Sequence, residues 1–156
     1  MEDWRKDRIG SAARGENPTV IARMKSGFAV IGDPQFLPGY CILLAYPKVG
    51  CLNDLSLEQR KDYLFDMSLI GDAITELCKP LRINYDILGN TDVFLHAHIF
   101  PRYDWEEERK KMPVWNYPRE YWSIDEYQYN DVKFGELKTS LKIKLQELME
   151  LNYTIK

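Results

Sequence analysis

Two histidines, His96 and His98, are the residues of this sequence whose type and spacing best suit chemistry. They are the only histidines of the chain, and they stand two positions apart in the largely apolar run 93–100. Residues two apart in a β-strand lie on the same face, about 7 Å from each other. The pattern therefore predicts a strand over 93–100 that projects both imidazoles from one face. The apolar residues that alternate with them face the core.

From the residues alone, three interpretations of this pair stay open. The imidazoles could be structural or surface groups, which is the commonest role of a histidine. They could chelate a metal such as zinc, but a zinc site needs further ligands and no other histidine exists. They could also serve nucleophilic catalysis, with one imidazole attacking while the other binds or protonates a substrate oxygen.

The segments around the histidines predict an antiparallel sheet that carries one major helix. Apolar and β-branched runs bounded by turn-forming residues predict strands over residues 19–23, 28–32, 40–46 and 84–88. The helix starts at Ser56, which forms a capping box with Gln59, and Pro80 ends it. A Gly-Asn turn at 89–90 joins the last of these strands to the histidine strand as a hairpin, and Pro101 ends that strand. This order of elements predicts an α+β fold.

Further elements are predicted at both ends of the chain. A short helix over residues 3–14 precedes the sheet. Segment 102–129 is predicted to be an aromatic loop whose rings pack on the domain, although a ring such as Trp105 or Trp115 could close over a ligand. An amphipathic helix starts near residues 130–131, and its leucine stripe could serve as core or as a dimer contact.

Length and composition favour one globular domain over residues 1–156, with a core over about 17–103 and a tail with a helix over 104–156. A net charge of −3 argues against a nucleic-acid-binding protein, which needs a basic surface. The longest apolar stretch, residues 40–46, is too short to cross a membrane, and the charged N-terminus has no signal core. Three cysteines without a CxxC pair are typical of a reduced, cytoplasmic protein.

The histidine strand and its flanks resemble the signature of the histidine triad (HIT) superfamily. Residues 89–102 (GNTDVFLHAHIFPR) are similar to the Gly-[Gln/Asn]-[Ser/Thr] turn that leads into alternating histidine and apolar positions. Residues 36–48 (FLPGYCILLAYPK) resemble the strand that begins at Pro-Gly-His and ends at Pro-Lys in that family. The resemblance covers roughly residues 28–103. The segments beyond it are similar to those of a bacterial branch of HIT-like proteins related to diadenosine polyphosphate hydrolases.

This resemblance implies a HIT-like fold: an antiparallel sheet of about five strands with one major helix packed on it, plus N-terminal and C-terminal helical extensions. It also implies a homodimer, a small nucleotide as the partner, no cofactor and no metal.

The resemblance further implies a role for each residue that matches the motif. His96 would attack the α-phosphorus of a nucleotide, while its other ring nitrogen donates to a backbone carbonyl, that of Phe94. His98 would lie near the phosphate or the bridging oxygen. The other candidates would bind substrate: Asn90 and Thr91, with backbone amides, at the phosphate oxygens, Asp33 at the ribose hydroxyls, Ile31 and Pro34 beside the base, and Arg102 at the phosphate or merely at the surface.

Three supporting histidines of the family pattern are absent. Phe94 occupies the first triad position, Tyr40 follows Pro-Gly, and no histidine follows Pro-Lys, where Val49 and Gly50 stand. Tyr40 can still hydrogen-bond and so support His98.

We therefore expect a nucleotide hydrolase or nucleotidyl transferase that acts at the α-phosphate of a purine nucleotide conjugate. The conjugate would be a dinucleoside polyphosphate or a nucleoside phosphoramidate, cleaved through a nucleotidyl-histidine intermediate on His96. The alternative is a nucleotide-binding HIT-like protein without catalysis.

Overall fold

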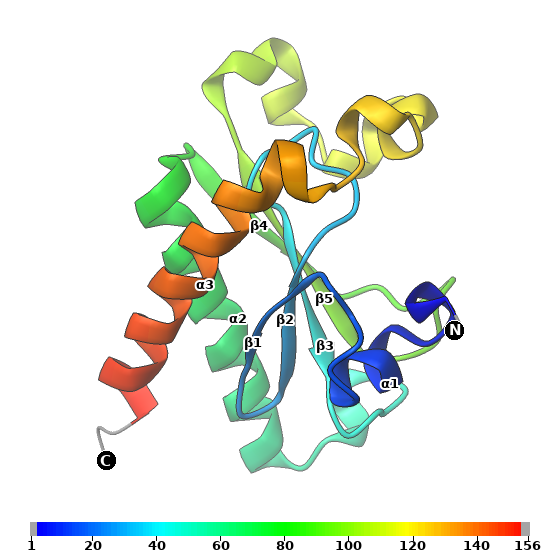
Figure 1. The fold of residues 1–156 in the computed structure, drawn as a ribbon, viewed down its shortest axis with the longest axis vertical. Helices are drawn as coiled ribbons and strands as arrows, with labels where there is room; N and C mark the ends of the chain where they lie inside the picture. The colour runs from blue at the N-terminus through cyan, green and yellow to red at the C-terminus, as the bar shows by residue number, and fades with distance from the viewer. Residues whose placement is uncertain (1–2, 154–156) are drawn as a thin grey trace.

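The computed structural model describes residues 3–153 and contains a five-stranded antiparallel sheet with helices on both faces (Figure 1). The spatial order is β1-β2-β3-β5-β4, and the strands are β1 (Val20–Arg23), β2 (Gly27–Ile31), β3 (Cys41–Ala45), β4 (Arg82–Asp86) and β5 (His96–Arg102). The α-helices are α1 (Arg8–Ala13), α2 (Leu57–Cys78) and α3 (Asp131–Tyr153). The predicted α+β class and the five-stranded sheet are confirmed.

Helix α2 forms where its capping signals place it. The Ser56 hydroxyl accepts from the amide of Gln59, and the Gln59 side chain accepts from the amide of Ser56, so both groups of the predicted capping box are present. The helix ends at Cys78, because Lys79 adopts a left-handed conformation (φ 51°) and Pro80 cannot continue the ladder. Its buried face packs on the sheet.

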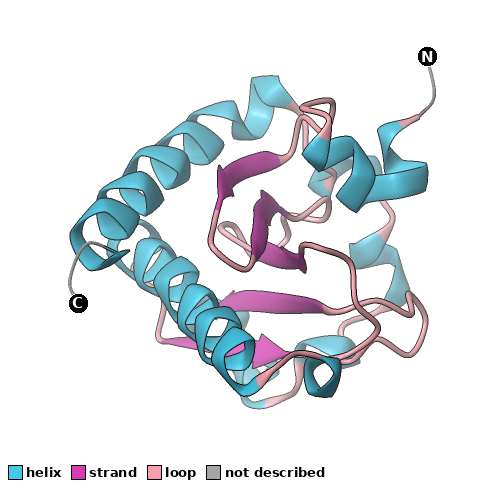
Figure 2. Ribbon diagram, turned by 90° about the horizontal axis from the view of Figure 1, so that it is seen from below, coloured by secondary structure: helices cyan, strands magenta, loops and turns pink. Residues whose placement is uncertain are grey.

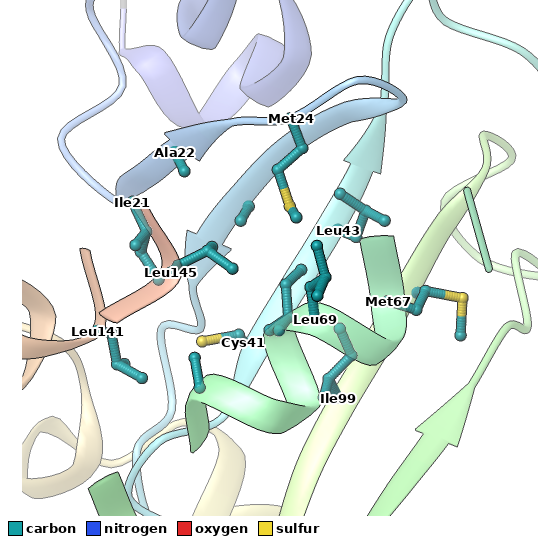
Figure 3. Packing of buried hydrophobic residues seen from close by; sticks show 14 of the residues in the cluster. Ile21, Ala22, Met24, Cys41, Leu43, Met67, Leu69, Ile99, Leu141 and Leu145 are labelled. Carbon is teal, nitrogen blue, oxygen red and sulfur yellow. The ribbon is translucent and has the colours of Figure 1, made fainter. Parts of the chain in front are cut away.

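Two long helices, rather than one, cover the same face of the sheet (Figure 2). The leucine stripe of α3 supplies Leu141, Leu145 and Met149 to the core that α2 and the sheet also form (Figure 3). Fully buried Asp66 of α2 ties these parts together, because it accepts from the Ser26 amide and hydroxyl and from the Tyr153 hydroxyl. The buried part of the α3 stripe is therefore core.

The hairpin that carries the histidines differs from its predicted bounds. Strand β4 ends at Asp86 and β5 begins at His96, so a nine-residue loop, 87–95, replaces the tight turn, and Phe94 lies outside the strand. Strand β5 also continues through Pro101 to Arg102. The register with β3 ends at the pair Cys41–Ile99, so beyond this point β4 alone pairs with β5, and a proline is tolerated there.

The aromatic segment after β5 is a chain of short 3-10 helices rather than an open loop. These are η3 (Asp104–Lys111), η4 (Val114–Asn116), η5 (Arg119–Trp122) and η6 (Asp125–Tyr127). Their rings form a second buried cluster with the end of the sheet, around Phe36 and Phe100. This cluster brings the segment over the sheet face that carries the histidines.

The role of α3 as core generates a stability prediction. Leu145 is 1% exposed, whereas Leu151 on the same helix is 64% exposed. We expect Leu145→Ala to lower the free energy of unfolding by about 2–5 kcal/mol, since it leaves a cavity. Leu151→Ala should change it by less than about 0.5 kcal/mol. Urea unfolding of both variants measures this, and equal effects would show that α3 is not part of the core.

Candidate functional site

Alternation along β5 divides its side chains between the two faces of the sheet. Ala97 and Ile99 are fully buried in the core beneath α2 and α3. His96 and His98 project from the opposite face, with ring centroids 4.9 Å apart. The predicted common face of the two imidazoles is therefore present, and it lies on a strand paired on both sides.

The tautomer of His96 is fixed by its own backbone neighbourhood. Its Nδ1 lies 2.8 Å from the carbonyl oxygen of Phe94. A carbonyl oxygen only accepts, so Nδ1 carries the proton and donates. In the neutral ring, Nε2 then holds the lone pair that a nucleophile or base requires. This hydrogen bond is the one expected from the sequence.

His98 is held by Tyr40, the residue that precedes β3. The hydroxyl of Tyr40 lies 2.7 Å from Nδ1 of His98. Tyr40 is buried, burial raises its pKa, and no other acceptor for its hydroxyl lies within reach among residues 3–153. The phenol therefore donates to Nδ1, and Nε2 of His98 bears the ring proton. Burial, followed by the neighbouring His96, lowers the pKa of His98 to about 4, so His98 is neutral at pH 7.

Both imidazoles open into a cavity of about 330 Å³ at the mouth of the β4–β5 loop. The loop contributes a continuous run of lining residues from Leu88 to Asp92, and the remaining lining residues are His96, His98 and Trp115. Gly89 adopts a positive φ of 77°, which bends this loop back over the histidines. Asn90 and Thr91 thus share one cavity with the histidine pair.

Trp115 is the part of the site that sequence reasoning placed least well. Its ring meets His98 edge to face at 5.0 Å and stacks on Trp122 at 4.9 Å. Its indole nitrogen donates to Asp86 at 3.2 Å, on the strand next to β5. Sequence pattern singled out Trp115 as one of two rings able to close over a ligand, without a signal to choose it over Trp105. The path of the 3-10 segment places Trp115 against His98, whereas Trp105 lines a different cavity.

Arg102 does not line the cavity. Its contacts correct the prediction that it binds a phosphate or lies at the surface. The side chain is almost fully buried and forms an ion pair with buried Glu106 at 2.9 Å. Its remaining donors reach Asn84 and the carbonyls of Arg109 and Met112. With its nitrogens bound internally, Arg102 anchors the 3-10 segment to the end of the sheet instead of binding a ligand.

The three residues predicted to contact the nucleoside, Ile31, Asp33 and Pro34, have other contacts in the structure. Ile31 packs in the core under α2 and α3, because its position in β2 points it away from the histidine face. Asp33 is engaged by Arg8, with 2.6 Å between the charged atoms. Pro34 pairs with Gln128 of the aromatic segment. None of these three residues lines the histidine cavity.

Within residues 3–153, no three side chains of His, Cys, Asp or Glu converge as a metal site would require. None of the helices in this described part is long and apolar enough to cross a membrane.

The neutral state of His98 generates a titration prediction. Between pH 8 and 5, the ring signals of His98 should stay those of a neutral Nε2–H imidazole in nitrogen-15 NMR. The free energy of unfolding should fall as pH drops from about 6.5 toward 4, by up to roughly 1.4 kcal/mol per unit, because the unfolded chain binds the proton more readily. Tyr40→Phe removes the hydroxyl that donates to Nδ1, so the ring proton of His98 should then occupy either nitrogen. A His98 midpoint near 6.5 would contradict this assignment.

Comparison with known proteins agrees with this geometry at the level of fold. No family model matches the sequence, and no curated protein matches it. Among solved structures, a histidine triad protein from Marinobacter aquaeolei VT8 superposes with a TM-score of 0.70 at 22% identity, over 83% of this chain and 89% of that chain.

A histidine triad (HIT) protein from Sinorhizobium meliloti 1021 gives a TM-score of 0.70 at 15% identity, over 92% of this chain and 96% of the other. The Plasmodium falciparum diadenosine triphosphate hydrolase gives 0.59 at 19% identity, over 83% and 77%. The five-stranded antiparallel sheet with its helices is thus the fold of the histidine triad proteins.

Proposed function

We propose that this chain is a nucleotide hydrolase or nucleotidyl transferase that attacks the α-phosphate of a purine nucleotide conjugate with His96. The observation that carries the proposal is the hydrogen bond from His96 Nδ1 to the Phe94 carbonyl, which leaves Nε2 unprotonated beside a cavity. The similarity in fold to a diadenosine triphosphate hydrolase supports the same class of reaction.

In the first step, Nε2 of His96 forms a bond to the α-phosphorus, and the bond to the leaving group breaks with its electron pair. The ring then carries a positive charge, which the Phe94 carbonyl stabilises at Nδ1. Water attacks the phosphorus next, the Nε2–P bond breaks, and the nucleoside monophosphate leaves. The proton of the attacking water passes to product or solvent, and His96 regains its neutral form.

His98 acts in this scheme as a hydrogen-bond donor and not as an acid. Its Nε2–H can stabilise charge on a phosphate or leaving oxygen. It cannot give up that proton readily, because a neutral imidazole would become an imidazolate. The leaving group should therefore depart as a stable anion, which favours a phosphate anhydride over a phosphoramidate. Asn90 and Thr91 line the same cavity, which supports a role for them at the phosphate oxygens, and Trp115 forms part of its wall.

The decisive test of this function combines turnover with intact-mass spectrometry on a diadenosine polyphosphate and an adenosine phosphoramidate. Wild type should release adenosine monophosphate, and His96→Ala should lose turnover by at least about 10²-fold, because the nucleophile is gone. Trp105→Ala, outside the cavity, is the control for a surface aromatic change and should keep activity. Equal turnover in wild type and His96→Ala would refute the mechanism.

The second candidate is a nucleotide-binding protein without turnover. Phe94 at the first triad position favours it, because its ring offers no hydrogen bond to a leaving group. Calorimetry that shows binding of adenosine monophosphate, with no cleavage of either conjugate, would support this reading.

We further propose that the protein works as a homodimer. Leu57, Leu64 and Phe65 expose an apolar surface on α2. The same helix contacts β4, an edge strand of the sheet, where Tyr85 lies over Gly71 of α2. An exposed apolar helix beside an open strand edge is a typical interaction surface.

The dimer is tested by sedimentation velocity. Phe65 is 44% exposed, and Phe65→Glu should convert a dimer into monomers by placing a charge in the apolar contact. Val132→Glu is the matched control, because Val132 is fully exposed at the start of α3, and this variant should stay dimeric. A monomeric wild type would overturn the proposal.

The compartment and the domain organisation are part of the same proposal. The free cysteines Cys41, Cys51 and Cys78 support a reducing, cytoplasmic environment, and the three packed clusters around one sheet support a single domain over residues 1–156.

A further inference from the structure

A second cavity, of about 130 Å³, lies directly beside the histidine cavity on the same face of the sheet. Asp92 lines both cavities, and Phe94 separates them, since its ring contacts the His96 ring at 4.9 Å. The lining of this second cavity holds more cations than carboxylates. It comes from the N-terminal segment, the residues just after β3 and the β4–β5 loop: Arg5, Lys6, Asp7, Arg8, Ile9, Lys48, Asp92 and Phe94. Four cations therefore face two carboxylates.

Among residues 3–153, two of these four cations have no carboxylate at ion-pair distance. Arg8 is paired with Asp33, and Arg5 only weakly with Asp3, at 3.5 Å between exposed groups. Lys6 and Lys48 have no carboxylate within ion-pair distance among residues 3–153. Asp7 is engaged by the amide of Gly10 as a helix cap. An anion in this cavity can accept hydrogen bonds from the ammonium groups of Lys6 and Lys48.

Phe94 places one of these cations next to the reacting group. The Lys48 ammonium lies over the Phe94 ring, 5.4 Å from its centroid, on a ring that also touches His96. The cation–π contact keeps the ammonium at the boundary between the cavities. A histidine here could carry its own positive charge. The phenyl ring carries none, and the Lys48 ammonium over it supplies a positive charge beside the ring that touches His96.

We propose that this basic cavity is a subsite for a second phosphate group of the ligand, held by Lys48 and Lys6 while the first phosphate lies at His96. This inference rests on the proposed function and narrows its substrate to a nucleotide with at least two phosphates. The second phosphate can belong to a chain that continues from the α-phosphate or to a phosphate ester on the ribose. Both present the same anionic oxygens to the ammonium groups.

Calorimetry at fixed salt tests the subsite with four probes: adenosine monophosphate, its α,β-methylene diphosphate, adenosine 3′,5′-bisphosphate and inorganic tripolyphosphate. In wild type, one of the two doubly phosphorylated nucleotides should bind at least about tenfold more tightly than the monophosphate. A gain with the methylene diphosphate identifies the phosphate chain, and a gain with the bisphosphate identifies the ribose ester.

The paired change Lys6→Gln and Lys48→Gln should abolish this gain while the affinity for adenosine monophosphate stays within about twofold. Lys61→Gln on α2, which removes an equal charge outside both cavities, is the control and should keep the gain. If the gain is absent in wild type, or survives the paired change, the subsite is refuted. A wild type that binds neither nucleotides nor tripolyphosphate refutes it equally.

The two proposals fail in different ways. A wild type that shows the gain without cleaving any conjugate retains the anion subsite and loses the hydrolase function. Turnover that depends on His96, without any gain from a second phosphate, retains the function and loses the subsite.

Discussion

The hydrogen bond between His96 Nδ1 and the Phe94 carbonyl is the constraint on which the chemistry of this fold depends. It decides which nitrogen carries the proton, and so whether a lone pair faces the cavity. Phe94, whose carbonyl accepts this bond, lies in the β4–β5 loop just before β5 begins at His96. The alternation of β5 then directs both imidazoles outward while its other side chains hold the strand in the core. A one-residue register shift would bury both imidazoles and remove the site.

The second imidazole is held by a hydrogen bond from a buried tyrosine. Tyr40 follows the Pro-Gly pair at the start of β3 and reaches across the sheet to His98. Its phenol is both donor and packing group, because the ring also stacks on Phe100 at 4.1 Å. A buried neutral His98 with a fixed tautomer is the consequence.

The aromatic segment joins the site through a buried ion pair. Arg102 at the end of β5 and Glu106 in η3 form this ion pair, and both side chains are almost fully buried. Removing one partner would leave an uncompensated charge, which costs roughly 3–5 kcal/mol. The pair therefore pins the start of the segment to β5, and the stacked Trp115 and Trp122 rings follow from that anchorage. In this way a residue expected at a phosphate positions the wall of the cavity instead.

The sequence by itself determined the α+β class, the capped helix α2 and the face shared by His96 and His98, because these follow from local spacing and capping chemistry. It also indicated the loop residues Asn90 and Thr91 through their place before the histidine strand. Only the tertiary structure decided what Ile31, Asp33 and Arg102 contact. The face on which Ile31 lies depends on strand position, and the ion pairs of Asp33 and Arg102 depend on partners from other elements. The same holds for Trp115 and Lys48, which lie beside the histidines only after segments far apart in sequence pack together.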